Sequence, residues 1–119
     1  DLFDQLPDET RAPFQSQGVA GTVLNYYIEM YLCEGTEVYV MRCPDGQEDV
    51  EGMNGKVAAI RLSGGTAYRT PRGLTVGDTA YRAWLLYGKC AFTSSFYYQV
   101  EDGYVSTIVF HTRYWGSSF

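Results

Sequence analysis

The side chains that could support catalysis in this sequence are a single histidine, His111, and three cysteines, Cys33, Cys43 and Cys90. An imidazole that takes the proton of a thiol would make a small hydrolase, with Cys43 or Cys90 as the nucleophile beside His111. One histidine at the end of an expected strand, with the cysteines dispersed along the chain, is more often structural. A hydrolase that uses His111 therefore ranks third among the functions that we expect.

The sequence gives no indication of a metal or a cofactor. The intervals between the cysteines fit neither a zinc knuckle nor a Cys-x-x-Cys redox motif. Cys33 closes one expected strand and Cys43 ends the next, so the length of a strand separates them and they lie beyond the reach of a disulfide. The chain also contains no phosphate loop, dinucleotide fingerprint, nucleophile elbow or His-Glu-x-x-His motif. We expect free thiols, no cofactor, no metal site, no catalytic residue and no enzyme activity.

The densest group of carboxylates is formed by Glu48, Asp49 and Glu51. Paired carboxylates can hydrolyse glycosides where an apolar setting raises the pKa of one of them. These three lie in a polar loop over residues 44–55, PDGQEDVEGMNG, with turn sequences at both of its ends. We expect solvent to surround their side chains, so a surface loop explains them better than a catalytic pair.

The tyrosines, of which there are 11, give the better indication of a function. Neighbouring residues of a strand point to opposite faces, so one of Tyr97 and Tyr98 faces away from a helix packed on the sheet. We assign that place to Tyr98 and expect Tyr39, Tyr104 and Trp115 to join it. Clustered rings on such a face suit a protein or glycan partner. The competing interpretation is that the rings only cover the sheet or meet another copy of the chain.

Composition and charge exclude several kinds of partner. The formal net charge is -5, which leaves no basic face for a nucleic acid or an anionic membrane. No run of 18 apolar residues is present, so no segment is expected to span a membrane. The 119 residues, 45% of them hydrophobic, are typical of one domain with its own core. The sequence begins with Asp1, and we expect a processed or trimmed chain whose signal or anchor has been removed.

The first half of the chain is expected to supply strands. Residues 1–21 are interrupted by prolines and glycines, and we expect an irregular lead-in held to the body by its Leu and Phe side chains. Residues 22–32, TVLNYYIEMYL, fit an amphipathic helix, or a strand whose even-numbered positions from Leu24 to Leu32 are all apolar. Their Tyr and Ile content favours the strand. Strands over 36–43 and 56–62 complete this first hairpin region, residues 22–62.

The second half is expected to form a helix-plus-hairpin module over residues 73–110. Asp78 is a suitable N-cap and Gly88 a suitable residue for the end of a helix over 78–88. Between them the helix presents a broad apolar face, which must lie on a sheet. The two strands of the hairpin follow, joined at Glu101-Asp102-Gly103.

Two segments share the pattern Gly-x-Val-x-x-Ile-x-(Leu or Phe), over residues 55–62 and 103–110. Each segment follows a turn and an aromatic strand. We interpret the match as the trace of a half-repeat, although two hairpins that obey the same local rules would also produce it.

The order GLTVGDT (73–79), a helix ending Leu-Tyr-Gly, then Phe-Tyr-Tyr and DGYVSTI resembles the helix-plus-hairpin unit of small exported bacterial domains. These are the SmpA/OmlA outer-membrane lipoproteins, the BLIP-like β-lactamase inhibitor repeats and uncharacterised extracytoplasmic domains of Gram-positive gut bacteria. The resemblance covers residues 66–110 well and 36–62 loosely, and departs at Lys89-Cys90, where the lipoprotein pattern has a proline. It implies an exported domain that binds proteins or the cell envelope, and it carries over no catalytic residue.

We therefore expect one α+β domain over residues 1–119, with an antiparallel sheet of four to six strands and one main helix on one face, BLIP-like or SmpA-like. The expected function is that of a non-enzymatic, extracytoplasmic binding module, secreted or lipid-anchored, for a protein or a cell-envelope component. The alternative is a structural or assembly domain whose open sheet face forms a homo-oligomer.

Overall fold

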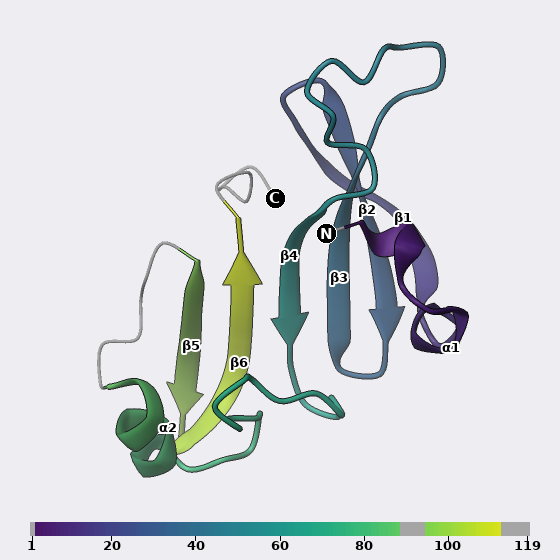
Figure 1. The fold of residues 1–119 in the computed structure, drawn as a ribbon. Coiled ribbons are helices and arrows are strands. Elements are labelled where there is room, and N and C mark those ends of the chain that lie inside the picture. The colour runs from purple at the N-terminus through teal and green to yellow at the C-terminus, as the bar shows by residue number, and fades with distance from the viewer. Residues whose placement is uncertain (1, 89–94, 113–119) are drawn as a thin grey trace.

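The computed structural model describes residues 2–88 and 95–112, which form one six-stranded antiparallel sheet with the strand order β1-β2-β3-β4-β6-β5 (Figure 1). The strands are β1 (Gln15–Val23), β2 (Tyr26–Cys33), β3 (Thr36–Arg42), β4 (Val57–Leu62), β5 (Phe96–Glu101) and β6 (Tyr104–His111). The helical elements are a 3-10 turn, η1 (Phe3–Gln5), a single turn, α1 (Asp8–Arg11), and the main helix, α2 (Ala80–Tyr87). The predicted α+β architecture, an antiparallel sheet with one main helix, is confirmed.

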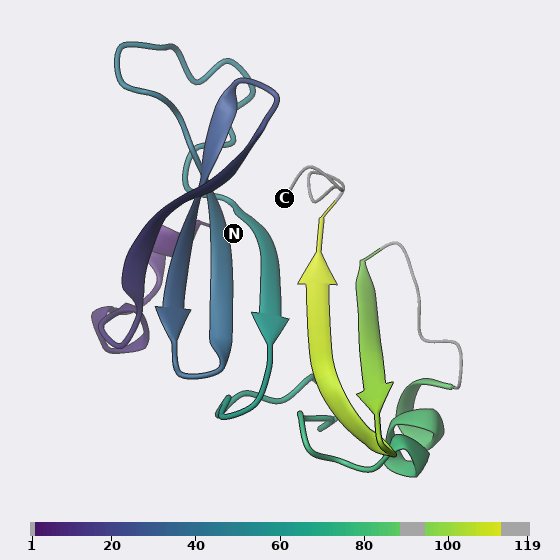
Figure 2. The same ribbon diagram turned by 180° about the vertical axis from the view of Figure 1, so that it is seen from behind.

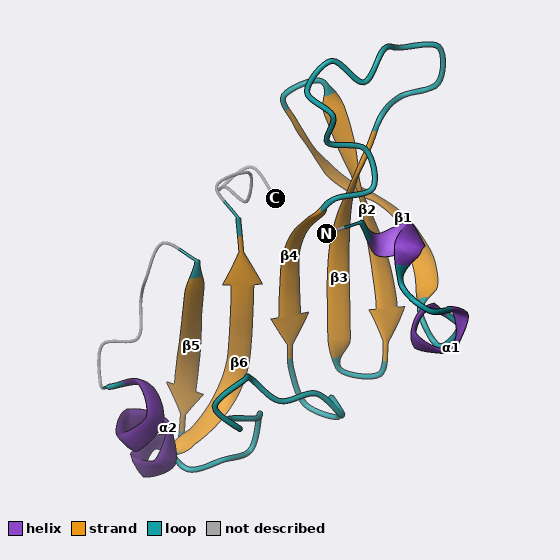
Figure 3. Cartoon of the chain, in the orientation of Figure 1, coloured by secondary structure: helices purple, strands orange, loops and turns teal. Residues whose placement is uncertain are grey.

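The helical elements lie on the same side of the sheet, as the front and rear views show (Figures 1 and 2). Figure 3 places α2 at one end of the β5–β6 hairpin and η1 with α1 beside β1 and β2. We call this side, which carries Val38, Ile60 and Ile108, the covered face. The side that carries Arg61, Thr107 and Val109 is called the far face, because side chains alternate along a strand.

The core of the molecule consists of three clusters of buried side chains. Under α2 pack Leu62, Leu74, Ala83, Val105 and Ile108. Under the N-terminal segment, residues 2–14 with η1 and α1, the covered face continues with Phe3, Val38 and Val40. The third cluster, Tyr26, Ile28, Met41 and Ala58, forms where the β1–β2 hairpin twists across the other end of the sheet. The clusters under α2 and under the N-terminal segment, which are the two covers of the covered face, meet at Ile60, because it packs against both.

The start of α2 differs from the prediction by one residue. Thr79, and not Asp78, is the N-cap, since its hydroxyl accepts a hydrogen bond from the backbone N–H of Arg82 at 3.1 Å. The Asp78 carboxylate instead accepts from the backbone N–H of Thr75 at 2.9 Å and closes the preceding turn. At the other end Gly88 has a φ of 84° and its N–H bonds to the Trp84 carbonyl, as a helix-ending glycine should.

Replacing Thr79 by alanine is expected to lower the free energy of unfolding by about 1 kcal/mol, because the first turn of α2 loses a hydrogen-bond acceptor. Replacement by serine keeps the hydroxyl and should change it by much less. Urea unfolding of the two variants measures both values. A loss for alanine no larger than that for serine would contradict the assignment of the cap.

The prediction of an irregular lead-in over residues 1–21 is wrong for its second part. Residues Gln15–Val23 form β1, which pairs with β2 from Gln15 opposite Leu32 to Val23 opposite Tyr26. An edge strand that is mostly exposed needs only the backbone hydrogen bonds of one neighbour, so it shows no alternation of apolar residues. Residues 22–32 do take the strand form, but the chain turns at Leu24, with φ 54°, so they belong to two strands.

The two segments that share a pattern have the same irregularity in the sheet. In β4, Ala58 is an extra residue between the pairs Tyr39–Ala59 and Val40–Val57. In β6, Ser106 is the extra residue between the pairs Gln99–Thr107 and Val100–Val105. A bulge at this position turns Val and Ile, three residues apart, to the same face. The shared pattern Gly-x-Val-x-x-Ile is thus the sequence of a bulged strand, repeated in two hairpins whose β4 and β6 strands pair.

Candidate functional site

The far face of the sheet contains a concavity of about 310 Å³. Its lining comes from five strands and consists of Ala20, Tyr39, Arg61, Tyr97, Gln99, Thr107 and Val109. Thr107 and Val109 are buried and form its floor, whereas Arg61 and Gln99 are exposed at its rim. We call this concavity the far-face pocket.

The alternation of β4, β5 and β6 places these side chains together. Arg61 lies between Ile60 and Leu62, both of which point to the covered face. Arg61 is also paired directly across the sheet with Val109, so the junction of the two hairpins runs through the pocket. A strand whose apolar residues serve the core on one face therefore presents its polar residues in the pocket on the other.

One end of the pocket carries a connected polar group. The Tyr39 hydroxyl donates a hydrogen bond of 2.6 Å to the Glu37 carboxylate, and an Arg61 guanidinium nitrogen lies 3.7 Å from the same oxygen. Burial of the phenol, together with this hydrogen bond to a carboxylate, raises the pKa of Tyr39 above its ordinary value. The hydroxyl therefore stays protonated at neutral pH and remains a hydrogen-bond donor.

The side chains of the far-face pocket can bind a polar ligand. They supply phenol rings, a guanidinium, an amide and a hydroxyl, which can bind polar groups and pack against the flat side of a ring. Among the described residues that line the pocket there is no histidine, cysteine or carboxylate, and the Glu37 carboxylate contacts the lining residues Tyr39 and Arg61 from one end. Over residues 2–88 and 95–112, no group of three His, Cys, Asp or Glu side chains is placed to hold a metal ion.

The predicted binding residues are only partly brought together. Tyr39 lines the far-face pocket, as expected. Tyr98 does not, because it pairs with Ile108 on the covered face and its hydroxyl donates to the Gly88 carbonyl at 2.6 Å, under α2. The assignment of Tyr98 to the open face is therefore wrong, and its neighbour Tyr97 takes that position. Tyr104 is 56% exposed beside the start of α2, outside the pocket, and Trp115 lies outside the described residues.

The polar members of the pocket, Arg61, Gln99 and Thr107, were missed by the search for aromatic residues. Their signal in the sequence is that each stands directly beside a residue that packs on the covered face, so it must face the other way. The bulges at Ala58 and Ser106 shift that alternation by one residue, so the set can be collected only when the register is known.

The surroundings of His111 contain no catalytic partner among the residues that the structure describes. One ring nitrogen lies 3.4 Å from the Thr112 carbonyl oxygen, and the ring centre lies 5.9 Å from that of Tyr97. Cys33 and Cys43 are free thiols, and the Cys43 thiol donates to the carbonyl of Gln47. Cys90, the other thiol considered as a nucleophile, lies outside the described residues.

The acidic loop over residues 44–55 is exposed, as expected, but one of its carboxylates organises it. Asp49 accepts hydrogen bonds from the Tyr26 hydroxyl and from the backbone N–H groups of Met53 and Asn54. The hydrogen bond from Tyr26 is the largest of the effects that lower the pKa of Asp49 below its ordinary value, and the backbone bonds act in the same direction. Desolvation opposes them with a smaller effect. Asp49 is therefore the centre of a structured loop and has a structural role.

No family model, no curated protein and no solved structure matches this chain. None of the helices in the described part is long and apolar enough to cross a membrane.

Proposed function

We propose that this chain is a non-enzymatic binding module of the cell exterior, and that it recognises a glycan of the cell envelope in the far-face pocket. The observation that carries the proposal is the set of side chains from five strands on one concave face: tyrosine rings beside an arginine, an amide and a hydroxyl. Sugars are bound by this combination, because their rings have apolar faces and their edges carry many hydroxyls.

The dimensions of the far-face pocket support a ligand of this kind. At about 310 Å³ it lies at the lower end of the range of ligand pockets, roughly 300–1,000 Å³. Its rim is formed by two exposed residues, Arg61 and Gln99, which leaves it accessible to one unit of a longer polymer. The export of the domain rests on the resemblance of residues 66–110 to exported bacterial modules.

The proposal is tested by co-sedimentation of the full chain with insoluble peptidoglycan, and by calorimetry with soluble fragments of it. Arg61→Ala and Gln99→Ala should each weaken binding about tenfold, since each removes hydrogen bonds to the ligand. Tyr81→Ala, at an exposed position on α2, is the matched control and should leave binding unchanged. Equal binding by all three variants, or no sedimentation of the unaltered chain, would overturn the proposal.

The alternative, a homo-oligomer formed through the same face, predicts a different result. Light scattering at micromolar concentration would then give the mass of a dimer or larger assembly, and Arg61→Ala would reduce that mass. A monomer whose peptidoglycan binding depends on Arg61 favours the binding module.

A further inference from the structure

A second concavity, of about 220 Å³, lies on the covered face beside the N-terminal segment. One wall is the N-terminal segment, the other is the extended segment over residues 66–72, and the floor is formed by β3, β4 and β6. It is lined by Phe3, Leu6, Thr10, Phe14, Thr36, Val38, Val57, Ile60, Leu62, Tyr68, Arg69 and Phe110. We call it the apolar groove.

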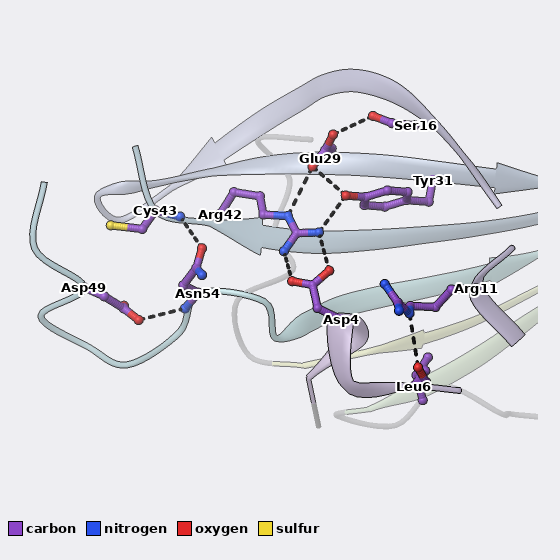
Figure 4. Close-up of polar contacts among 10 residues, drawn as sticks. All are labelled: Asp4, Leu6, Arg11, Ser16, Glu29, Tyr31, Arg42, Cys43, Asp49 and Asn54. Atoms are coloured by element: carbon purple, nitrogen blue, oxygen red, sulfur yellow. Dashed lines mark hydrogen bonds and ion pairs between the residues drawn. The ribbon is translucent and has the colours of Figure 1, made fainter. Parts of the chain in front are cut away.

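The walls of the apolar groove are held in place by contacts of their own. The Phe3 ring packs against Tyr31 at 4.6 Å and edge-on against Phe14 at 6.2 Å between ring centres. Phe14 in turn lies 6.4 Å from Tyr68, so the two walls meet through these rings. Asp4, next to Phe3, is tied to Arg42 of the sheet (Figure 4). A groove whose walls are fixed in this way needs little reorganisation to accept a ligand.

The lining of the apolar groove is almost entirely hydrocarbon. The buried Thr36 hydroxyl at its floor is already paired with the hydroxyl of Thr66 at 2.7 Å, so it needs neither water nor a ligand group. An apolar cavity of about 150 Å³ is large enough to stay dry and take up benzene. The apolar groove, at about 220 Å³, has room for a larger apolar group than that.

Arg69 is the single charged residue among those that line the groove. One of its guanidinium nitrogens donates to the Gly73 carbonyl at 3.0 Å, which leaves other N–H groups of the fork for a ligand. None of the ion pairs found among the described residues involves Arg69. In a chain with a net charge of -5, Arg69 places a positive charge beside the apolar groove.

We propose that the apolar groove binds a fatty acid, with its acyl chain along the apolar lining and its carboxylate at Arg69. A guanidinium binds a carboxylate through two parallel hydrogen bonds, which no uncharged head group can form. The acyl chain covers the apolar side chains of the lining, which would otherwise be exposed to water. This site is separate from the far-face pocket and does not depend on the function proposed for it.

Calorimetry of the full chain with octanoate, decanoate and dodecanoate, each below its micelle concentration, tests the acyl site. Affinity should rise about fourfold for each added methylene until the groove is filled, because each methylene leaves water. Decanol should bind about tenfold more weakly than decanoate, and decyltrimethylammonium more weakly still, since neither can pair with Arg69. Equal affinity for decanoate and decanol, or no rise with chain length, would overturn the proposal.

Variants locate the carboxylate. Arg69→Gln should remove the preference for decanoate over decanol while leaving the affinity for decanol unchanged, and Arg69→Lys should keep most of the preference. Arg82→Gln, at an exposed arginine of α2 outside both concavities, is the matched control and should behave as the unaltered chain. Decanoate binding that depends on Arg61 and not on Arg69 would contradict the assignment and point to the far-face pocket.

Isotope labelling of methyl groups keeps the test decisive if a variant folds poorly. In the unaltered chain, decanoate should shift the methyl resonances of Ile60, Val38 and Leu6, which line the groove, and leave that of Val50 in the exposed loop unchanged. Decanoate shifts confined to Val109, in the far-face pocket, would overturn the placement of the ligand. Shifts at Ile60 caused by an apolar peptide, with none caused by decanoate, would also overturn it.

Discussion

Replacing Ile108 by alanine is expected to lower the free energy of unfolding by about 2–5 kcal/mol. Ile108 is 0% exposed and lies at the centre of the cluster under α2, where Leu62, Leu74 and Ala83 also pack. The truncation removes buried methyl groups and leaves a cavity that the paired strands around it can only partly close. Urea unfolding, followed by circular dichroism, measures the change in midpoint and in free energy.

The matched control is Val19→Ala, because it also truncates a β-branched residue of a strand. Val19 is 67% exposed on the edge strand β1, so its replacement should change the free energy of unfolding by less than about 0.5 kcal/mol. A loss at Ile108 as small as that at Val19 would mean that α2 does not seal this cluster.

The main helix and the hairpin after it could be predicted from sequence because their signals are local. Gly88 ends the helix and Gly103 makes the turn, and both need only the backbone freedom of glycine at a positive φ. The predicted N-cap fell one residue too early, because Asp78 and Thr79 are both good capping residues. Which of them caps the helix depends on Thr75, whose N–H binds the Asp78 carboxylate.

Strand β1 could not be predicted, because its strand conformation depends on pairing with β2 and not on its own sequence. Its sequence, QSQGVAGTV, has few apolar residues and two glycines, and its pairing with β2 is interrupted twice by register shifts. The hydrogen bonds offered by β2 hold it in the sheet. The residues of the far-face pocket could not be predicted for a similar reason, since the choice between Tyr97 and Tyr98 depends on the register of β5 against β6.

The N-terminal segment was expected to be held by its apolar side chains, and the structure adds a polar anchor that the sequence did not indicate (Figure 4). The Arg42 guanidinium, whose side chain is 13% exposed, donates to both oxygens of Asp4, to Glu29 at 3.1 Å and to the Tyr31 hydroxyl at 2.6 Å. These partners come from the N-terminal turn and from β2. Arg42 thus joins the N-terminal segment to the sheet.

Replacing Arg42 by methionine is expected to lower the free energy of unfolding by about 1.5–3 kcal/mol, because two carboxylates lose a charged donor whose own side chain is largely buried. Asp4→Asn should reproduce part of this loss. Asp8→Asn, which breaks the exposed pair with Arg11, is the matched control and should cost at most about 1 kcal/mol. A smaller loss at Asp4 than at Asp8 would contradict the role of Arg42 as an anchor.

The same network predicts how the stability changes with pH. The hydrogen bond from Arg42 lowers the pKa of Asp4, against a smaller effect of burial. Burial acts to raise the pKa of Glu29, but hydrogen bonds from Ser16, Tyr31 and Arg42 together outweigh it and lower that pKa. A carboxyl whose pKa is lower in the folded state contributes its stability above the unfolded pKa and loses it as the pH falls through the folded value.

The difference in unfolding free energy between the unaltered chain and Arg42→Met should therefore have its largest value at pH 7. It should begin to narrow near pH 4.5, the ordinary pKa of Glu29, and narrow further below 3.8, that of Asp4. Urea unfolding of both proteins at pH 7, 4.5 and 3 measures this difference. A difference that stays constant or widens on acidification would mean that the carboxylates do not depend on Arg42, and that the rings of Phe3 and Phe14 hold the N-terminal segment alone.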